Sequence, residues 1–175
     1  MKTIKTIYFT ALLMVGLLTL NSCGDDDDSS GLELTPTELA GTYFLTLAES
    51  TTITEQVFDA GIVTSTIETT GDTFDQSNYT FSTDGTYTQD WRYRVTQTSS
   101  ATIEDQETEE SIFITTINDS GTYSTSDVNS TITIDGNIYD VTRFNNSELR
   151  LELNETFTDA ITTQTFNEVL HFNRQ

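Results

Sequence analysis

Residues 78–95 read Asn-Tyr-Thr-Phe-Ser-Thr-Asp-Gly-Thr-Tyr-Thr-Gln-Asp-Trp-Arg-Tyr-Arg-Val, and this stretch decides the fold class. Apolar and polar residues alternate on both sides of Asp84-Gly85, which is the period of a half-buried strand. An Asp-Gly pair between two alternating runs is one of the strongest short-range signals for a hairpin. In the second run, Tyr87, Trp91 and Tyr93 fall on the same face. The stretch therefore predicts two antiparallel strands with an aromatic inner face.

The same alternation recurs along the rest of the chain, and turn residues such as Asp135-Gly136 separate the runs. Further strands are predicted at residues 41–47, 52–58, 62–69, 111–117, 130–134, 138–144, 148–153 and 163–173. In the first of them, Tyr43, Leu45 and Leu47 are expected to share the inner face. Only residues 37–40 are expected to form a helical turn. Nine or ten antiparallel strands, each with one apolar face, must curl into a closed wall or stack as two layers. We predict an all-β fold, an antiparallel up-and-down β-barrel, with a two-sheet β-sandwich as the alternative.

Charge and residue counts exclude several functions. The chain has 28 acidic and seven basic residues and a formal net charge of −21, so it repels nucleic acid. Cys23 is the one cysteine and His171 the one histidine, which leaves no disulfide within the chain and no zinc site. His171 alternates outward from Leu170 and Phe172. We predict no enzyme activity, no cofactor and no metal.

The N-terminus has the pattern of a secretion signal. Lys2 and Lys5 precede an apolar run at residues 7–20, and Cys23 follows closely. A membrane-spanning helix needs about 20 apolar residues, so this run is too short to be one. An ordinary signal peptide with an incidental cysteine is the alternative interpretation.

Leu20-Asn21-Ser22-Cys23 resembles the lipobox of bacterial lipoproteins, in which the cysteine receives the lipid, although Asn21 departs from the strict pattern. The four aspartates at residues 25–28 resemble the surface-export signal of Bacteroidota lipoproteins. The resemblance implies a signal peptide at 1–22, a lipidated Cys23 with a flexible acidic stalk at 23–36, and a domain at 37–175. It also implies an outer-membrane anchor, with the domain at the cell surface or, as the alternative, facing the periplasm.

Several short motifs in the body of the chain resemble the lipocalin-like lipoproteins of Bacteroidota. They are Leu39-Ala40-Gly41-Thr42-Tyr43, Tyr79 to Tyr87, Gly121-Thr122-Tyr123, Glu148-Leu149-Arg150-Leu151 and Glu168 to Arg174. The resemblance implies that Gly41, Tyr43 and Arg174 close the barrel, with the arginine packed on the aromatic ring, where lipocalins have a tryptophan instead of Tyr43. A guanidinium over a tyrosine face stabilises by about 0.5–2 kcal/mol.

The inner face supplies the candidate ligand-binding residues. They are Tyr87, Trp91, Tyr93, Tyr139, Arg143, Phe166 and Glu168. A buried carboxylate must be paired, protonated or hydrated, so we hypothesise that Glu168 meets Arg143 inside the barrel. The alternative is a one-residue shift or bulge that places both side chains outside. Core packing alone also accounts for the aromatic residues.

The expected function is capture of a small, mainly apolar ligand by an envelope-anchored barrel. The alternative is a non-enzymatic structural or adhesion lipoprotein with a filled interior. The only partners predicted are the membrane, through the N-terminal lipid, and the small hydrophobic ligand.

Overall fold

The computed structural model describes residues 33–102 and 107–175. The signal peptide, Cys23 and the aspartate run lie outside the described residues, and so does part of the acidic segment after Ala101. The described strands are β1 (Gly41–Phe58), β2 (Gly61–Asp72), β3 (Asn78–Phe81), β4 (Thr86–Ala101), β5 (Glu109–Ser126), β6 (Thr131–Ile134), β7 (Asn137–Phe144), β8 (Glu148–Thr158) and β9 (Thr162–Arg174), and the described helix is α2 (Pro36–Leu39).

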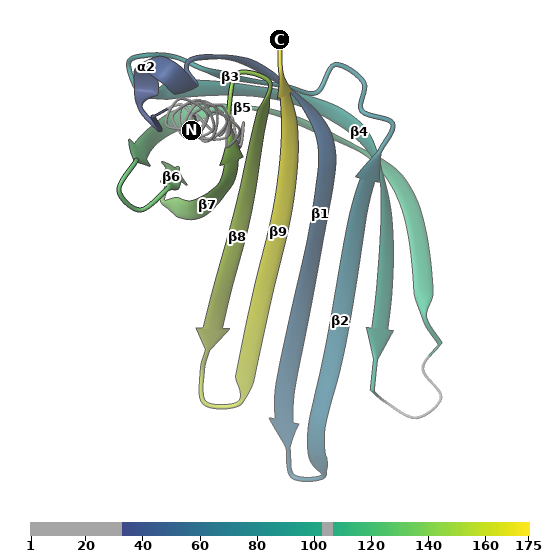
Figure 1. The fold of residues 1–175 in the computed structure, drawn as a ribbon. Helices are drawn as coiled ribbons and strands as arrows, with labels where there is room; N and C mark the ends of the chain where they lie inside the picture. Colours follow the sequence, from purple (N-terminus) through teal and green to yellow (C-terminus); the bar gives the residue numbers. More distant parts are fainter. Residues whose placement is uncertain (1–32, 103–106) are drawn as a thin grey trace, which may run out of the picture. The chain divides into compact units, whose positions relative to one another are not determined.

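All nine described strands belong to one antiparallel sheet that closes on itself through β1 and β9 (Figure 1). β3 and β2 both lie between β1 and β4, at different points along these two strands. The start of β1 pairs with β3 and its remainder pairs with β2. β4 pairs with the same two strands from the other side. The fold is therefore an up-and-down barrel, and the predicted fold class is confirmed.

The two Asp-Gly turns form where the sequence predicted them. Asp135 and Gly136 both have positive φ, +48° and +95°, between β6 and β7. This conformation twists with the flanking strands, which explains the preference for Asp-Gly in two-residue hairpins. Gly85, in the turn between β3 and β4, has a φ of +82°. These turns set the pairing of the hairpins and therefore the face on which each side chain lies.

The wall of the barrel is complete at one end only. β5 pairs with the short strand β6 only through Tyr123–Ser126, and β7 pairs with β8 only as far as Glu152. Within the described part of the chain, residues 109–121 of β5 and 153–158 of β8 thus have a paired strand on one side alone. Figure 1 shows β8, β9, β1, β2, β4 and β5 extending well past the β6–β7 hairpin.

We call the part that contains β3, β6, β7 and their paired segments the closed end. The open end comprises residues 50–70, 96–101, 109–117, 153–158 and 162–168. The buried core lies mainly at the closed end, where Tyr43, Phe81, Ile132, Leu149 and Phe172 are almost completely buried. At the open end the same faces carry mostly threonine, serine and glutamine, such as Thr52, Thr54 and Gln56 on β1.

Helix α2 covers the closed end. Thr35 accepts a hydrogen bond from the Glu38 amide (3.3 Å) and Pro36 occupies the first helical turn, two features that favour a helix start. Leu39 is fully buried, and its carbonyl accepts a hydrogen bond from the Tyr43 hydroxyl (2.9 Å). No helix in residues 33–102 or 107–175 combines the length and the apolar character needed to cross a membrane.

The structure corrects two expectations. Residues 41–58 form one continuous strand, and a register shift between Leu45 and Leu47 turns Ala48 inward, 7% exposed, while Leu47 is only half-buried. The stalk was expected to reach residue 36. Leu34 is instead buried, and its amide donates to Asp127 Oδ1 (2.9 Å), so the folded part begins before α2.

Candidate functional site

A cavity of about 270 Å³ lies beside the β6–β7 hairpin, at the border between the closed and open ends. Four aromatic residues contribute to its lining, namely Tyr79, Tyr87, Trp91 and Tyr139. Three carboxylates contribute as well, namely Asp119, Asp135 and Glu168. The cavity is just below the usual size range of small-molecule pockets, which starts near 300 Å³. Its side chains come from β3 to β9, seven of the nine described strands, and from the β6–β7 turn.

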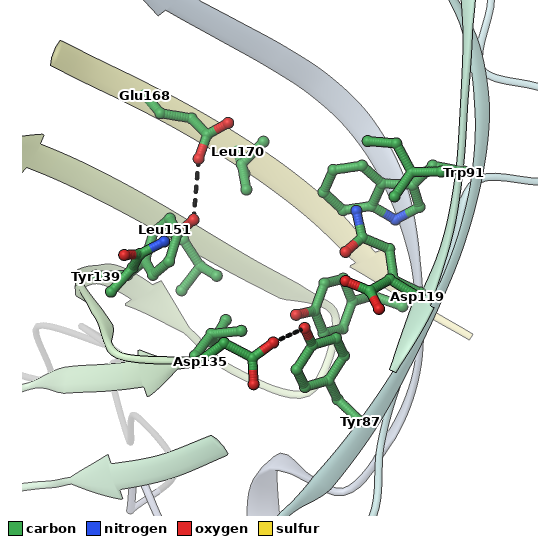
Figure 2. Close-up of a pocket in the computed structure, with 13 residues that line it drawn as sticks. Tyr87, Trp91, Asp119, Asp135, Tyr139, Leu151, Glu168 and Leu170 are labelled. Carbon is green, nitrogen blue, oxygen red and sulfur yellow. Dashed lines mark hydrogen bonds between the residues drawn. The ribbon is translucent and has the colours of Figure 1, made fainter. Parts of the chain in front are cut away.

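Glu168 lies on the inner face of β9, two residues before the buried Leu170. Tyr139 on β7 donates a hydrogen bond from its hydroxyl to Glu168 Oε2 (3.1 Å; Figure 2). Burial raises the pKa of Glu168, and the Tyr139 hydrogen bond opposes that rise. Burial, followed by the nearby Glu168 charge, raises the pKa of Tyr139. The pair is therefore a desolvated carboxyl group held by a neutral phenol.

A second pair, Asp135 and Tyr87, lies at the rim of the cavity. The Tyr87 hydroxyl donates a hydrogen bond to Asp135 Oδ2 (Figure 2). The Thr122 amide donates a second one to Asp135 Oδ1 (3.0 Å). These two hydrogen bonds lower the pKa of Asp135. Burial and the bond to Asp135 raise the pKa of Tyr87 to about 12. A Cβ at Gly121 would collide with the Asp135 carboxylate, so the glycine makes this approach possible.

Trp91 forms the opposite side of the cavity from Glu168 (Figure 2). It is only 5% exposed, and its Nε1 is buried without a hydrogen-bond partner among the described residues. An indole N–H removed from water normally finds an acceptor, because leaving it unpaired costs about 1–3 kcal/mol. The indole ring thus lines the cavity, whereas its N–H lies beneath the cavity surface.

The structure brings together four of the seven predicted ligand-binding residues, which are Tyr87, Trp91, Tyr139 and Glu168. Tyr93 lies one step along β4, packs on Phe74 with ring centroids 5.2 Å apart, and shares a hollow of about 30 Å³ with Glu168. Phe166 is half-buried against the core and pairs with Thr52. These two residues lie next to the cavity and not in its lining.

Arg143 is not in the cavity. A register shift between Val141 and Arg143 turns the side chain outward, where its Nε lies 2.5 Å from Glu148 Oε2. The side chain is about half exposed. The hypothesised pair of Glu168 with Arg143 is therefore wrong, because a bulge in β7 moves one partner to the other face.

Sequence reasoning missed three lining residues that carry a carboxylate or an aromatic ring. Asp135 was interpreted only as a turn residue, and Asp119 lies just beyond the strand predicted at residues 111–117 and received no role. Tyr79 alternates with Phe81 on one face of β3, and that signal was sufficient to place it inside. The hairpin turn that positions Asp135 over β5 is a tertiary contact, so spacing along the chain could not reveal it.

The barrel-closing residues lie together where β1 meets β9. The Arg174 guanidinium carbon lies 5.6 Å from the centre of the Tyr43 ring, and Arg174 Nη2 donates to the Ala40 carbonyl (2.7 Å). A Cβ on Gly41 would come within 3.3 Å of Arg174 Nε, so the glycine leaves space for the guanidinium. These contacts hold the start of β1 against the end of β9.

Fold and site together define a class: an antiparallel up-and-down barrel, incomplete on one side, with an aromatic and acidic cavity at the end of the gap. No family model, no curated protein and no solved structure matches the chain. In residues 33–102 and 107–175, no three His, Asp or Glu side chains come together as metal ligands.

Proposed function

We propose that this chain binds a small, mainly apolar molecule in the cavity beside the β6–β7 hairpin, and that a lipid on Cys23 anchors it to the outer membrane, outside the cytoplasm. The anchor is supported by the leader pattern of residues 1–23 and its resemblance to bacterial lipoproteins. One acyl chain gives only reversible binding, whereas several on one cysteine hold a protein at the membrane. The resemblance to lipocalin-like lipoproteins agrees with a ligand-binding barrel.

The observation that carries the proposal is a cavity of about 270 Å³ whose lining includes four aromatic side chains and the desolvated Glu168. The burial of the Glu168 carboxyl group lowers the stability of the free protein. Such costs are typical of binding sites, where a ligand supplies the missing interactions. Aromatic and aliphatic side chains, such as Tyr79, Leu151 and Leu170, supply the apolar contact.

The alternative is a structural or adhesion lipoprotein, and one observation favours it. The segment of β5 that is paired on one side only exposes three consecutive apolar side chains, Ile112 (61%), Phe113 (44%) and Ile114 (57%). An exposed edge of this kind is a template for pairing with another strand. In that case the edge of β5, and not the cavity, would be the functional surface.

Native mass spectrometry of the full chain, extracted in mild detergent, tests the first proposal. We expect a bound small molecule that is lost in Ile117→Trp, because Ile117 lines the cavity and the larger side chain fills it. The matched control is Thr116→Trp, which introduces the same side chain on the outer face of β5. A bare wild-type protein, or equal retention in both variants, would contradict cavity binding.

The anchor has its own test. Cys23→Ser removes the sulfur that would receive the lipid and is expected to move the protein from the membrane fraction to the soluble fraction. Digestion of intact cells by an added protease distinguishes a surface-facing domain, which is cleaved, from a periplasm-facing one. Membrane retention of the serine variant would contradict lipid attachment at this residue.

A further inference from the structure

The cavity has an unbalanced charge. Asp119, Asp135 and Glu168 line it, and its lining contains no lysine, arginine or histidine. The whole chain is strongly acidic as well, so the protein supplies no general positive field that would offset these carboxylates. A ligand that brings a positive charge relieves the mutual repulsion, whereas an anionic ligand increases it. The charge of the lining therefore favours a cation.

The arrangement of the three carboxylates separates an organic cation from a metal ion. In the described residues they do not form a group that could coordinate one ion. Asp135 already accepts hydrogen bonds from Tyr87 and from the Thr122 amide. Glu168 accepts one from Tyr139 at Oε2, and its Oε1 has no donor among the described residues. Glu168 is thus the carboxylate best able to receive an ammonium group, which donates up to three hydrogen bonds.

Aromatic rings occupy the space between the carboxylates. Tyr79 stacks on Tyr87 with ring centroids 4.9 Å apart, and Trp91 lies 5.7 Å from Tyr79, so these rings form one continuous aromatic surface. Aromatic faces attract ammonium groups and also bury the apolar body of a ligand. The wall therefore suits a molecule that is mainly apolar and has one charged end.

We propose that the cavity binds a small aromatic amine, with its ammonium group at Glu168 and its ring against the aromatic wall of Tyr79, Tyr87 and Trp91. This inference rests on the proposed binding function and adds the chemical class of the ligand. The site excludes carboxylate ligands through its own carboxylates, and it prefers an amine over a neutral compound of the same shape.

Three probes of the same shape and different charge test the inference by titration calorimetry on the full chain in mild detergent. They are tyramine, its neutral alcohol analogue tyrosol, and the anion 4-hydroxyphenylacetate. We expect tyramine to bind at least about tenfold more tightly than tyrosol, and the anion not to bind. Added salt should weaken tyramine binding and leave tyrosol binding unchanged, since screening acts on the charge.

Two substitutions separate the charge contact from the ring contact. Glu168→Gln should reduce tyramine affinity about tenfold and leave tyrosol affinity unchanged, whereas Trp91→Ala should weaken both probes, because each places a phenol ring against the aromatic wall. The matched control is Glu152→Gln on β8, which makes the same charge change beside the inward-facing Leu151 and Leu153 and outside the cavity lining. Near-UV circular dichroism verifies that each variant is folded.

The outcomes separate this inference from the proposed function. If tyrosol binds as tightly as tyramine, or if Glu168→Gln and Glu152→Gln have equal effects, the cation preference is wrong and cavity binding stands. If none of the probes binds while native mass spectrometry detects another ligand, the amine class is wrong and the binding function again stands. If both experiments find no ligand, both proposals fail.

Discussion

The closed and open ends of the barrel share the long strands β1, β4, β5, β8 and β9, and their inner faces differ in how far the side chains are buried. On β9, Leu170 and Phe172 are 4% and 1% exposed at the closed end, whereas the same face continues toward the open end with Phe166, Gln164 and Thr162. The pairing of β9 with β1 runs through both ends without interruption apart from the shift near Leu45. Strand formation in this protein therefore does not depend on a core along the whole strand.

Threonine explains how the open end holds together. Its branched side chain favours extended backbone and packs across strands, as in the cross-strand pair of Thr158 with Thr163. The ladder hydrogen bonds satisfy the backbone there, so little apolar burial is needed. The closed end supplies the stability, and the open end extends the sheet from it.

The largest difference is expected between two phenylalanines, one at each end. Phe172→Ala at the closed end should reduce the free energy of unfolding by about 3–5 kcal/mol, through lost burial and a cavity. Phe157→Ala on β8 at the open end, where the side chain is 64% exposed, should change it by less than about 0.5 kcal/mol. Urea unfolding measures both, and similar losses in the two variants would show that the open end contributes to the core.

A smaller difference is expected between two arginines. Arg174→Ala removes the contact with Tyr43 and the hydrogen bond to the Ala40 carbonyl, and should cost about 2 kcal/mol. Arg94→Ala removes an ion pair with Asp72 in which both side chains are about half exposed, so it should cost less than about 1 kcal/mol. Thermal unfolding at matched salt compares them. Equal costs would argue against a closing role for Arg174.

The smallest effect on stability is expected for Glu168, which lies at the border between the two ends. Burial raises the pKa of Glu168 in the folded state, so the native protein retains this proton to higher pH than the unfolded chain. Stability from this residue is therefore fully present below the unfolded pKa of about 4.3 and declines as pH rises through the folded pKa. Glu168→Gln has no such decline and should be about 1 kcal/mol more stable than the parent at neutral pH. Unfolding curves from pH 3 to pH 8 test this, and a constant gap across that range would contradict it.

The comparison also shows what the sequence could predict. Alternation and Asp-Gly turns identified the strands, the barrel class and the inward direction of Tyr87, Trp91, Tyr139 and Glu168, because these depend on local period and turn chemistry. The same reasoning gave wrong side-chain directions at two bulges. The shift near Leu45 moved Leu47, and the shift near Val141 moved Arg143, since one extra residue reverses every later side chain and leaves no mark in composition.

The site was harder to predict than the fold for a related reason. The carboxylate of Asp135 reaches Tyr87 only because the β6–β7 hairpin folds over β5 beside Gly121. The unpaired Trp91 Nε1 is a property of its surroundings, and no sequence pattern reports a missing partner. The incomplete wall between β5 and β8 likewise follows from the short lengths of β6 and β7, which alternation defines only to within a few residues.

The gap in the wall has a kinetic consequence. Asp119, Asp135 and Asn137 line the cavity and remain exposed to solvent, so a ligand can enter sideways without any strand separating or any lid opening. Association should then be limited by encounter and orientation, at rates near those of unhindered docking. Residence time, and not access, would decide how long this protein keeps what it captures.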